Sequence, residues 1–208
     1  LYSNNSSYYS MIARLVLAEK AVAYELHHID IHIKMEQFAP EFVSIQPNMT
    51  VPVLVCDGVN IADSHQILLF VNKYFSGPDL CPAEDEAAIL KSLDLHYAFS
   101  IEDLTMGTAL RNSPIAGFAL GRGLKRAARR CQELMRTHPE FKSACENKLK
   151  LEDERQRLIL SKENNYAQVL AQAIKLCDSL EVELSQHEFA ASKHYSLADV
   201  VWTVFLAR

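Results

Sequence analysis

The fold is decided by one stretch, Asn48-Met49-Thr50-Val51-Pro52-Val53-Leu54-Val55-Cys56-Asp57-Gly58-Val59-Asn60-Ile61-Ala62-Asp63-Ser64-His65-Gln66-Ile67. Its β-branched residues at positions 51, 53 and 55 favour a strand, and those at 59 and 61 favour a second strand. The Asp57-Gly58 pair between the two runs is typical of a two-residue hairpin turn. Pro52 is compatible with the first strand because a residue at the start of a strand need not donate to the sheet. The stretch therefore predicts a hairpin, followed by a helix that begins near Ser64.

A strand, a helix and a second strand are predicted before the hairpin. Residues 1–3 form the end of the first strand, and the apolar residues at 11, 12, 15, 16 and 18 give one stripe of a helix. Alternating apolar residues between 22 and 33 favour the second strand. A strand, a helix and a strand within about 30 residues form a βαβ unit with parallel strands. The segment 1–76 is therefore predicted to be an α/β domain.

The rest of the chain is predicted to be all helical. Residues 76–82 hold a glycine and two prolines and form a linker. Apolar periodicity then predicts a long helix up to 112 and further helices over 119–136, 139–151 and 161–184. A last helix opens at Ser196, because Ser196 and Asp199 have the spacing of a capping box. The second domain, 83–208, thus contains a long, polar helical insertion.

The composition is that of an ordinary globular protein. The 208 residues are 49% hydrophobic and 23% charged, and the net charge of −5 argues against a general nucleic-acid binder. The sequence contains no run of about 18 apolar residues, so it predicts no membrane span. The five cysteines lack a CxxC pair, which favours reduced thiols in the cytosol or nucleus and no zinc site. The sequence starts at Leu1 without Met, so a longer terminus could carry an anchor, and residues could be missing before Ser196.

Several motifs carry a resemblance to a known family. They are Pro47, Val51-Pro52-Val53-Leu54, Asp57-Gly58, Asp63-Ser64-x-Gln66-Ile67, Ser7-x-x-Ser10, Arg14-Leu15-Val16 and Ala18-Glu19-Lys20. Together they resemble the cytosolic glutathione transferases of the serine type. The insertion is similar to that of the tetrachlorohydroquinone dehalogenase-like class and the ganglioside-induced differentiation-associated protein family. The resemblance implies an α/β N-terminal thioredoxin-like domain and an all-α C-terminal domain, as in the glutathione transferase fold.

The resemblance also implies how glutathione is held. In the family the bond between the residues matching Val51 and Pro52 is cis, and the main chain of Val51 would pair with the cysteinyl part. Asp63 and Ser64 would hold the γ-glutamyl end, and Gln37 the glycyl carboxylate. Asp63 and Ser64 could instead form a plain N-cap, and Gln37 could be a solvated loop residue. Asp63 is one methylene shorter than the glutamate usual in the family.

Ser7 is the residue that the resemblance places at the glutathione sulfur. A thiol of pKa about 8.5 is mostly neutral at pH 7, so a hydroxyl donor beside a helix N-terminus would favour the thiolate. The alternative is that Ser7 is only an N-cap or turn serine. Ser6 and Ser10 could take its place, and a phenol from Tyr8 or Tyr9 could also be the donor.

The function implied is that of a detoxifying transferase. The glutathione thiolate would attack a hydrophobic electrophile, by conjugation or by dehalogenation-like chemistry. The expected electrophile pocket draws on His96, Tyr97, Ser100 and Leu104, in a cleft against the second domain. Glutathione is then a co-substrate, no metal is needed, and a cytoplasmic homodimer is expected by resemblance.

A basic helix leaves a second function open. Arg122, Arg126, Arg129 and Arg130 fall on one face of the predicted helix, within the basic segment 122–136. A solvated face is the default interpretation, and a patch for an anionic lipid or an anionic substrate is the alternative. The chain could therefore be a non-catalytic, glutathione transferase-like module for protein interaction or membrane association.

Overall fold

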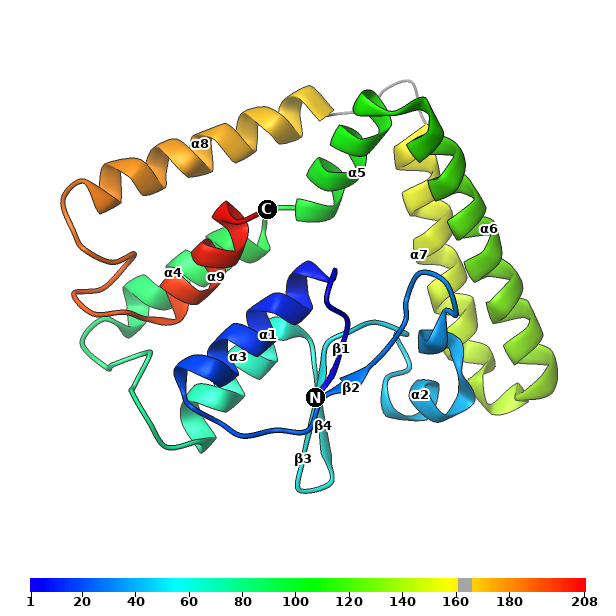
Figure 1. The fold of residues 1–208 in the computed structure, drawn as a ribbon, viewed down its shortest axis with the longest axis horizontal. Helices are drawn as coiled ribbons and strands as arrows, with labels where there is room; N and C mark the ends of the chain where they lie inside the picture. Colours follow the sequence, from blue (N-terminus) through cyan, green and yellow to red (C-terminus); the bar gives the residue numbers. More distant parts are fainter. Residues whose placement is uncertain (161–165) are drawn as a thin grey trace. The chain divides into compact units, whose positions relative to one another are not determined.

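The computed structural model describes residues 1–160 and 166–208, which form two compact units (Figure 1). The first unit comprises Leu1–His28, Val51–Phe99 and Ala171–Arg208. The second unit comprises Ile29–Thr50 and Ser100–Leu170. Neither unit is continuous in sequence, so each depends on contacts between segments far apart in the chain.

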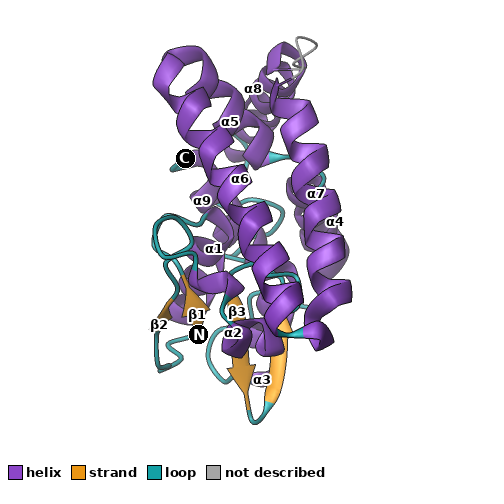
Figure 2. Ribbon diagram, turned by 90° about the vertical axis from the view of Figure 1, so that its right-hand side faces the viewer, coloured by secondary structure: helices purple, strands orange, loops and turns teal. Residues whose placement is uncertain are grey.

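The first unit contains a mixed sheet in the order β2-β1-β3-β4 (Figure 2). Its strands are β1 (Tyr2–Ser3), β2 (His27–His28), β3 (Val53–Cys56) and β4 (Val59–Ala62). β1 and β2 are parallel, whereas β3 is antiparallel to both β1 and β4. The backbone φ angles of Asp57 and Gly58 are 49° and 79°, as a tight hairpin turn with two positive φ angles requires. The predicted hairpin and parallel pair are confirmed.

Helices α1 (Tyr8–Glu19) and α3 (Ser64–Tyr74) pack against each other in the first unit (Figure 1). The apolar stripe predicted for α1 is fully buried at Ile12 and Val16, and α3, which packs on α1, is fully buried at Ile67. The other helices of this unit are α4 (Glu86–Tyr97) and α9 (Leu197–Leu206), which also pack on each other. The predicted capping box of Ser196 and Asp199 opens α9.

The second unit is built around two long helices, α6 (Pro114–Thr137) and α7 (Lys142–Leu160), which lie side by side (Figures 1 and 2). Its shorter elements are η1 (Glu36–Phe38), α2 (Pro40–Ile45), α5 (Ile101–Asn112) and η2 (Pro139–Phe141). α8 (Tyr166–Leu184) begins in this unit and continues into the first. The core of the second unit is a buried cluster of Met35, Phe38, Val43, Met49, Ala127, Cys131, Leu134 and Cys145.

Several predicted element boundaries were wrong. The strand expected over 22–33 is only His27–His28, because the Asp30 carboxylate accepts hydrogen bonds from the backbone amides of His32 and Ile33 and folds this segment into a turn. The helix expected up to 112 is interrupted, because the Ser100 hydroxyl caps a new helix by accepting from the amide of Asp103. α7 continues well beyond 151, and the predicted start of the next helix at 161 lies outside the described residues.

Candidate functional site

The cis peptide bond implied by the resemblance is present between Val51 and Pro52. Both residues are buried and lead directly into β3, which begins at Val53. Val53 in turn pairs with Tyr2 of β1 and Ala62 of β4. The sheet therefore fixes the backbone that directly follows Val51 and Pro52, because β3 has a paired strand on each side.

Asp63 and Ser64 open helix α3 at the end of β4. Asp63 has an unusual backbone conformation for a residue with a side chain, φ 75° and ψ 129°, and its carboxylate accepts from the amide of His65 at 2.8 Å. Strain of this kind collects at functional sites. The N-terminus of α3 carries partial positive charge, which favours a bound carboxylate. The N-cap interpretation of Asp63 is thus confirmed, and a cap at this place is compatible with ligand binding.

The Ser64 hydroxyl lies 3.0 Å from the hydroxyl of Tyr97. Ser64 is buried, and Tyr97 comes from α4, thirty-three residues later in the chain. Burial raises the pKa of Tyr97, so its phenol keeps its proton at neutral pH. The His65 ring stacks on the Tyr97 ring at a centroid distance of 4.8 Å, which holds the phenol in place. The sequence predicted Tyr97 as an electrophile-pocket residue, and no sequence pattern indicated its contact with Ser64.

The serines at the start of α1 differ in what their hydroxyl groups do. The Ser7 oxygen accepts from the amide of Ser10 at 3.3 Å, an N-cap bond that uses the oxygen and leaves the hydroxyl proton to donate. The Ser6 hydroxyl donates to the Asn4 side chain at 2.7 Å, so its proton is already engaged. Ser10 is fully buried. Ser7 is half-buried.

Tyr8, the alternative donor, is buried against His96. Its hydroxyl lies 2.6 Å from the His96 Nε2 atom, and burial raises the pKa of the phenol. His96 is itself only 3% exposed, and burial lowers its pKa to about 4. The imidazole also meets the edge of Trp202. His96 and Tyr8 therefore form a neutral, buried pair in the core of the first unit.

Three predicted site residues belong to the second unit. Gln37 is buried and its amide nitrogen donates to the Ile31 carbonyl at 3.3 Å, so the solvated-loop interpretation is wrong. Its Oε1 atom is buried without a hydrogen-bond partner among residues 1–160 and 166–208. Ser100 is exposed and caps α5, and Leu104 is half-buried on the same helix. These three side chains remain predicted ligand contacts.

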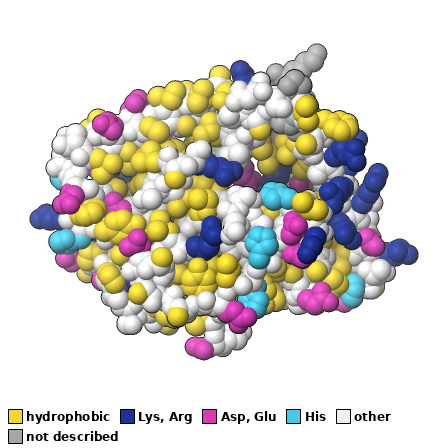
Figure 3. All heavy atoms as spheres, viewed as in Figure 1, with side chains coloured by type: hydrophobic (Ala, Val, Ile, Leu, Met, Phe, Trp, Pro, Cys, Tyr) yellow, Lys and Arg dark blue, Asp and Glu magenta, His cyan; other side chains and the backbone are white. Residues whose placement is uncertain are grey.

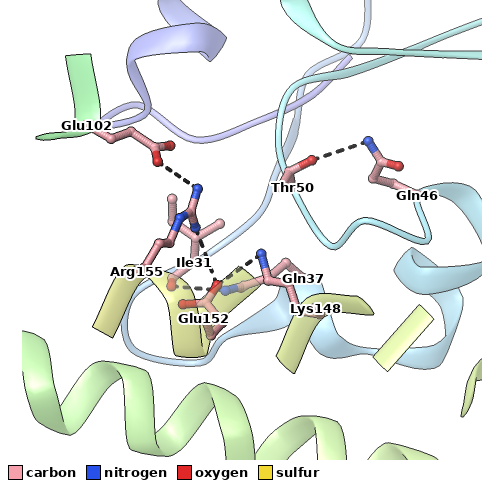
Figure 4. Close-up of polar contacts among 8 residues, drawn as sticks. All are labelled: Ile31, Gln37, Gln46, Thr50, Glu102, Lys148, Glu152 and Arg155. Carbon is pink, nitrogen blue, oxygen red and sulfur yellow. Dashed lines mark hydrogen bonds and ion pairs between the residues drawn. The ribbon is translucent and has the colours of Figure 1, made fainter. Parts of the chain in front are cut away.

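An ion-pair chain, which sequence analysis did not detect, lies in the same unit as Gln37 (Figure 4). Glu152 contacts Lys148 at 3.3 Å and Arg155 at 3.4 Å, and Arg155 contacts Glu102 of α5 at 2.6 Å. Lys148 and Glu152 are largely buried, so solvent screens that pair little, whereas the Arg155–Glu102 pair, which ties α7 to α5, is partly exposed. Elsewhere, the described residues include no group of three or more His, Cys, Asp or Glu that could hold a metal ion. No helix in the part of the chain that the structure describes is both long and apolar enough to cross a bilayer.

Known proteins show the same fold and sequence pattern. The family profile described as glutathione S-transferase, N-terminal domain, matches residues 6–73. The chain is 30% identical over 215 residues to the tetrachloro-p-hydroquinone reductive dehalogenase of Sphingobium chlorophenolicum. This alignment covers 100% of this chain and 81% of that protein. It is 27% identical over 200 residues to glutathione S-transferase F10 of Arabidopsis thaliana, covering 93% of this chain and 73% of that protein.

A solved structure shows the same fold. The beta-etherase LigF from Sphingobium sp. strain SYK-6 superimposes with a TM-score of 0.70 at 21% identity, covering 99% of this chain and 81% of that chain. The predicted fold class, a thioredoxin-like α/β part and an all-helical part, is confirmed. The predicted likeness to the dehalogenase-like class is confirmed by the Sphingobium chlorophenolicum relative. The chain therefore belongs to the glutathione S-transferase superfamily.

Proposed function

We propose that this protein is a glutathione transferase that activates the glutathione thiolate for attack on a hydrophobic electrophile. The observation that carries the proposal is the hydrogen bond between Ser64 and Tyr97 at the α3 N-terminus. This N-terminus follows the cis Val51-Pro52 bond and β3 in the chain. Superfamily membership supports glutathione as the co-substrate. No metal is needed for this chemistry.

Each part of glutathione would meet a different group. The Val51 main chain pairs with the cysteinyl unit, as an edge strand receives an added strand. Ser64 and the α3 N-terminus bind the γ-glutamyl carboxylate, and Asp63 meets the γ-glutamyl ammonium. One carboxylate oxygen of Asp63 accepts from His65, which leaves the other for the ammonium. Gln37 is proposed for the glycyl carboxylate through its side-chain amide nitrogen, which donates one N–H to the Ile31 carbonyl and has a second N–H to donate.

Ser7 would donate its hydroxyl proton to the glutathione sulfur. Each unit by which the thiol pKa falls requires about 1.4 kcal/mol of preference for the thiolate, which one or two hydrogen bonds can supply. The thiolate then forms a carbon–sulfur bond to the electrophile, and the leaving group departs with its electron pair. In the dehalogenation variant, a second glutathione thiolate attacks the sulfur of that conjugate. This step yields glutathione disulfide, and the carbon takes a proton from solvent.

The name of the Sphingobium chlorophenolicum relative, a tetrachloro-p-hydroquinone reductive dehalogenase, supports the halogenated aromatic class as the electrophile. Tyr97 is the pocket residue with the strongest support, since its ring is partly exposed while its hydroxyl meets Ser64. Ser100 and Leu104 remain proposed electrophile contacts, whereas the buried His96 would support the Tyr97 ring from behind. We also propose a cytoplasmic, detoxifying homodimer, with a glutathione-binding domain over 1–76 and a helical domain over 83–208.

The decisive experiment is glutathione titration by calorimetry, with turnover of a generic aryl halide measured in parallel. Ser7→Ala should lower kcat/KM about 10- to 100-fold, because the thiolate loses about 1.4–3 kcal/mol of stabilisation. The pH profile of kcat/KM should shift to higher pH, while glutathione affinity changes little. Ser6→Ala is the matched control and should keep the parent activity, because its proton is bound to Asn4.

Absence of glutathione binding at millimolar concentration would reject the proposal. That result would instead favour the non-catalytic interaction module. Equal losses in the two serine variants would keep the transferase but remove Ser7 as the specific donor.

A further inference from the structure

Helix α6 concentrates positive charge on an acidic protein. Its residues 114–137 include six Lys or Arg against one acidic residue, Glu133, which gives the helix a net charge of +5. The whole chain has a net charge of −5. This helix is therefore basic within a chain whose remaining residues are strongly acidic, and the proposed transferase chemistry makes no use of it.

The basic side chains form one exposed face, which we call the basic face: Arg122, Lys125, Arg126, Arg129, Arg130 and Arg136. Arg122, Arg129 and Arg136 are seven residues apart, which places them in one line along the helix. The opposite face is buried in the core cluster through Ala127, Cys131 and Leu134. In Figure 3 the Lys and Arg side chains gather on the side of the molecule where α6 lies.

The basic face continues into an exposed apolar tip at the start of α6. Ile115 lies seven residues before Arg122 and is 76% exposed, and Phe118 is 66% exposed. The Arg122 guanidinium lies over the Phe118 ring, 5.5 Å from its centroid. Two large apolar side chains and the arginines thus share the exposed side of the helix, so a surface that meets the arginines also meets the apolar tip.

The basic face contributes little to folding. Arg130 pairs with Glu133 at 3.5 Å, and Arg126 donates to the Ile33 carbonyl, both at the surface. Like charges stand four residues apart at Arg122 and Arg126, at Lys125 and Arg129, and at Arg126 and Arg130. Such pairs destabilise a helix. An anionic partner would neutralise these charges and so relieve the repulsion between them.

We propose that α6 docks on the surface of an anionic lipid bilayer, with its apolar tip entering the acyl boundary and the basic face on phospholipid head groups. From Ile115 to Arg136 the helix spans about 30 Å, far more than one small anion can cover. An extended anionic surface therefore fits the charge. The exposed Ile115 and Phe118 favour a bilayer over an acidic polypeptide, because only the bilayer offers an apolar layer below its charge.

The test is co-sedimentation of the 208-residue chain with vesicles. Phosphatidylcholine vesicles with about 30 mol% phosphatidylserine should bind the protein, and pure phosphatidylcholine vesicles should not. Binding should fall as salt is added. Arg122→Gln with Arg129→Gln should weaken binding about 25-fold, at about fivefold per lost charge. Lys142→Gln with Lys150→Gln removes two exposed charges from α7 and should leave binding nearly unchanged.

The apolar tip has its own matched pair of variants. Phe118→Ser should weaken vesicle binding, whereas Leu151→Ser, at an exposed leucine of α7, should not. The proposal is overturned if the protein binds neither kind of vesicle or binds both equally. It is overturned as well if the double arginine variant and the double lysine variant lose vesicle binding to the same extent. It is also overturned if soluble polyglutamate binds the protein while the vesicles do not, since the basic face would then serve an acidic polypeptide.

Discussion

At the scale of single residues, the hydrogen bond between Ser64 and Tyr97 orients the group that would meet the γ-glutamyl carboxylate. The Ser64 hydroxyl can rotate freely in the absence of a partner, and a rotating donor loses entropy when a ligand binds. Tyr97 removes that freedom because its phenol is itself fixed by stacking on His65. A buried tyrosine that keeps its proton can donate to Ser64 and leave the serine proton for the ligand.

Removal of the Tyr97 hydroxyl should therefore weaken glutathione binding while leaving the fold intact. We expect Tyr97→Phe to raise the glutathione Kd about 3- to 10-fold, which corresponds to one hydrogen bond of about 0.5–1.5 kcal/mol. Ser64→Ala should raise the Kd by at least as much, and the double variant should lose less than the sum of the two effects. Calorimetric titration measures all three. Tyr74→Phe, at an exposed tyrosine of α3, is the control. A Tyr97→Phe protein that binds like the parent while Ser64→Ala does not would contradict the orienting role.

At the scale of elements, α4 contributes a pH-sensitive contact through His96. This histidine is buried against Tyr8 of α1, Trp202 of α9 and the neighbouring rings. Its Nδ1 atom has no hydrogen-bond partner among the described residues. A proton added to the ring would place a charge in an apolar, aromatic environment, which explains why the pKa of His96 falls to about 4.

The stability of the first unit should therefore decrease as the pH falls from 6.5 to about 4. In this window the unfolded chain binds a proton that the folded chain rejects, so the free energy of unfolding drops by as much as about 3 kcal/mol. Below about pH 4 both states carry the proton and the loss ends. Urea unfolding at a series of pH values measures this slope. His96→Gln keeps a polar partner for Tyr8 but cannot titrate, so its slope in this window should be smaller. Equal slopes in the two proteins would show that His96 is not the group responsible.

Elements defined by local chemistry could be predicted from the sequence, and those defined by tertiary contacts could not. The hairpin at Asp57-Gly58 and the cap at Ser196 follow from residues within four positions of each other. The start of α5 depends on the Ser100 side chain in a segment with no proline or glycine to mark a break. In the site, the N-cap alternative for Ser7 is confirmed, because it depends only on the helix that directly follows. The Ser64–Tyr97 bond could not, since it joins residues 33 apart.

At the scale of the whole molecule, the reactivity of the five cysteines depends on how tightly each is packed in its unit. All five are free thiols. Cys177 is exposed on α8, and Cys56 and Cys81 in the first unit are half-buried. Cys131 and Cys145 are fully buried between α6 and α7, where burial raises the pKa of Cys131 to about 12 and also raises that of Cys145. Because the thiolate is the reactive form, burial and a high pKa both protect these two side chains.

Titration of the native protein with an aromatic disulfide reagent at pH 8 should accordingly modify three thiols and spare two. Cys177 should react first. Cys56 and Cys81 should follow more slowly, because burial raises the pKa of both. Cys131 and Cys145 should react only after denaturant is added, and Cys177→Ser should remove the fastest phase alone. Rapid reaction of all five thiols in native buffer would contradict the packed core between α6 and α7. The basic face of α6 would then lack the rigid support on which the proposed docking surface depends.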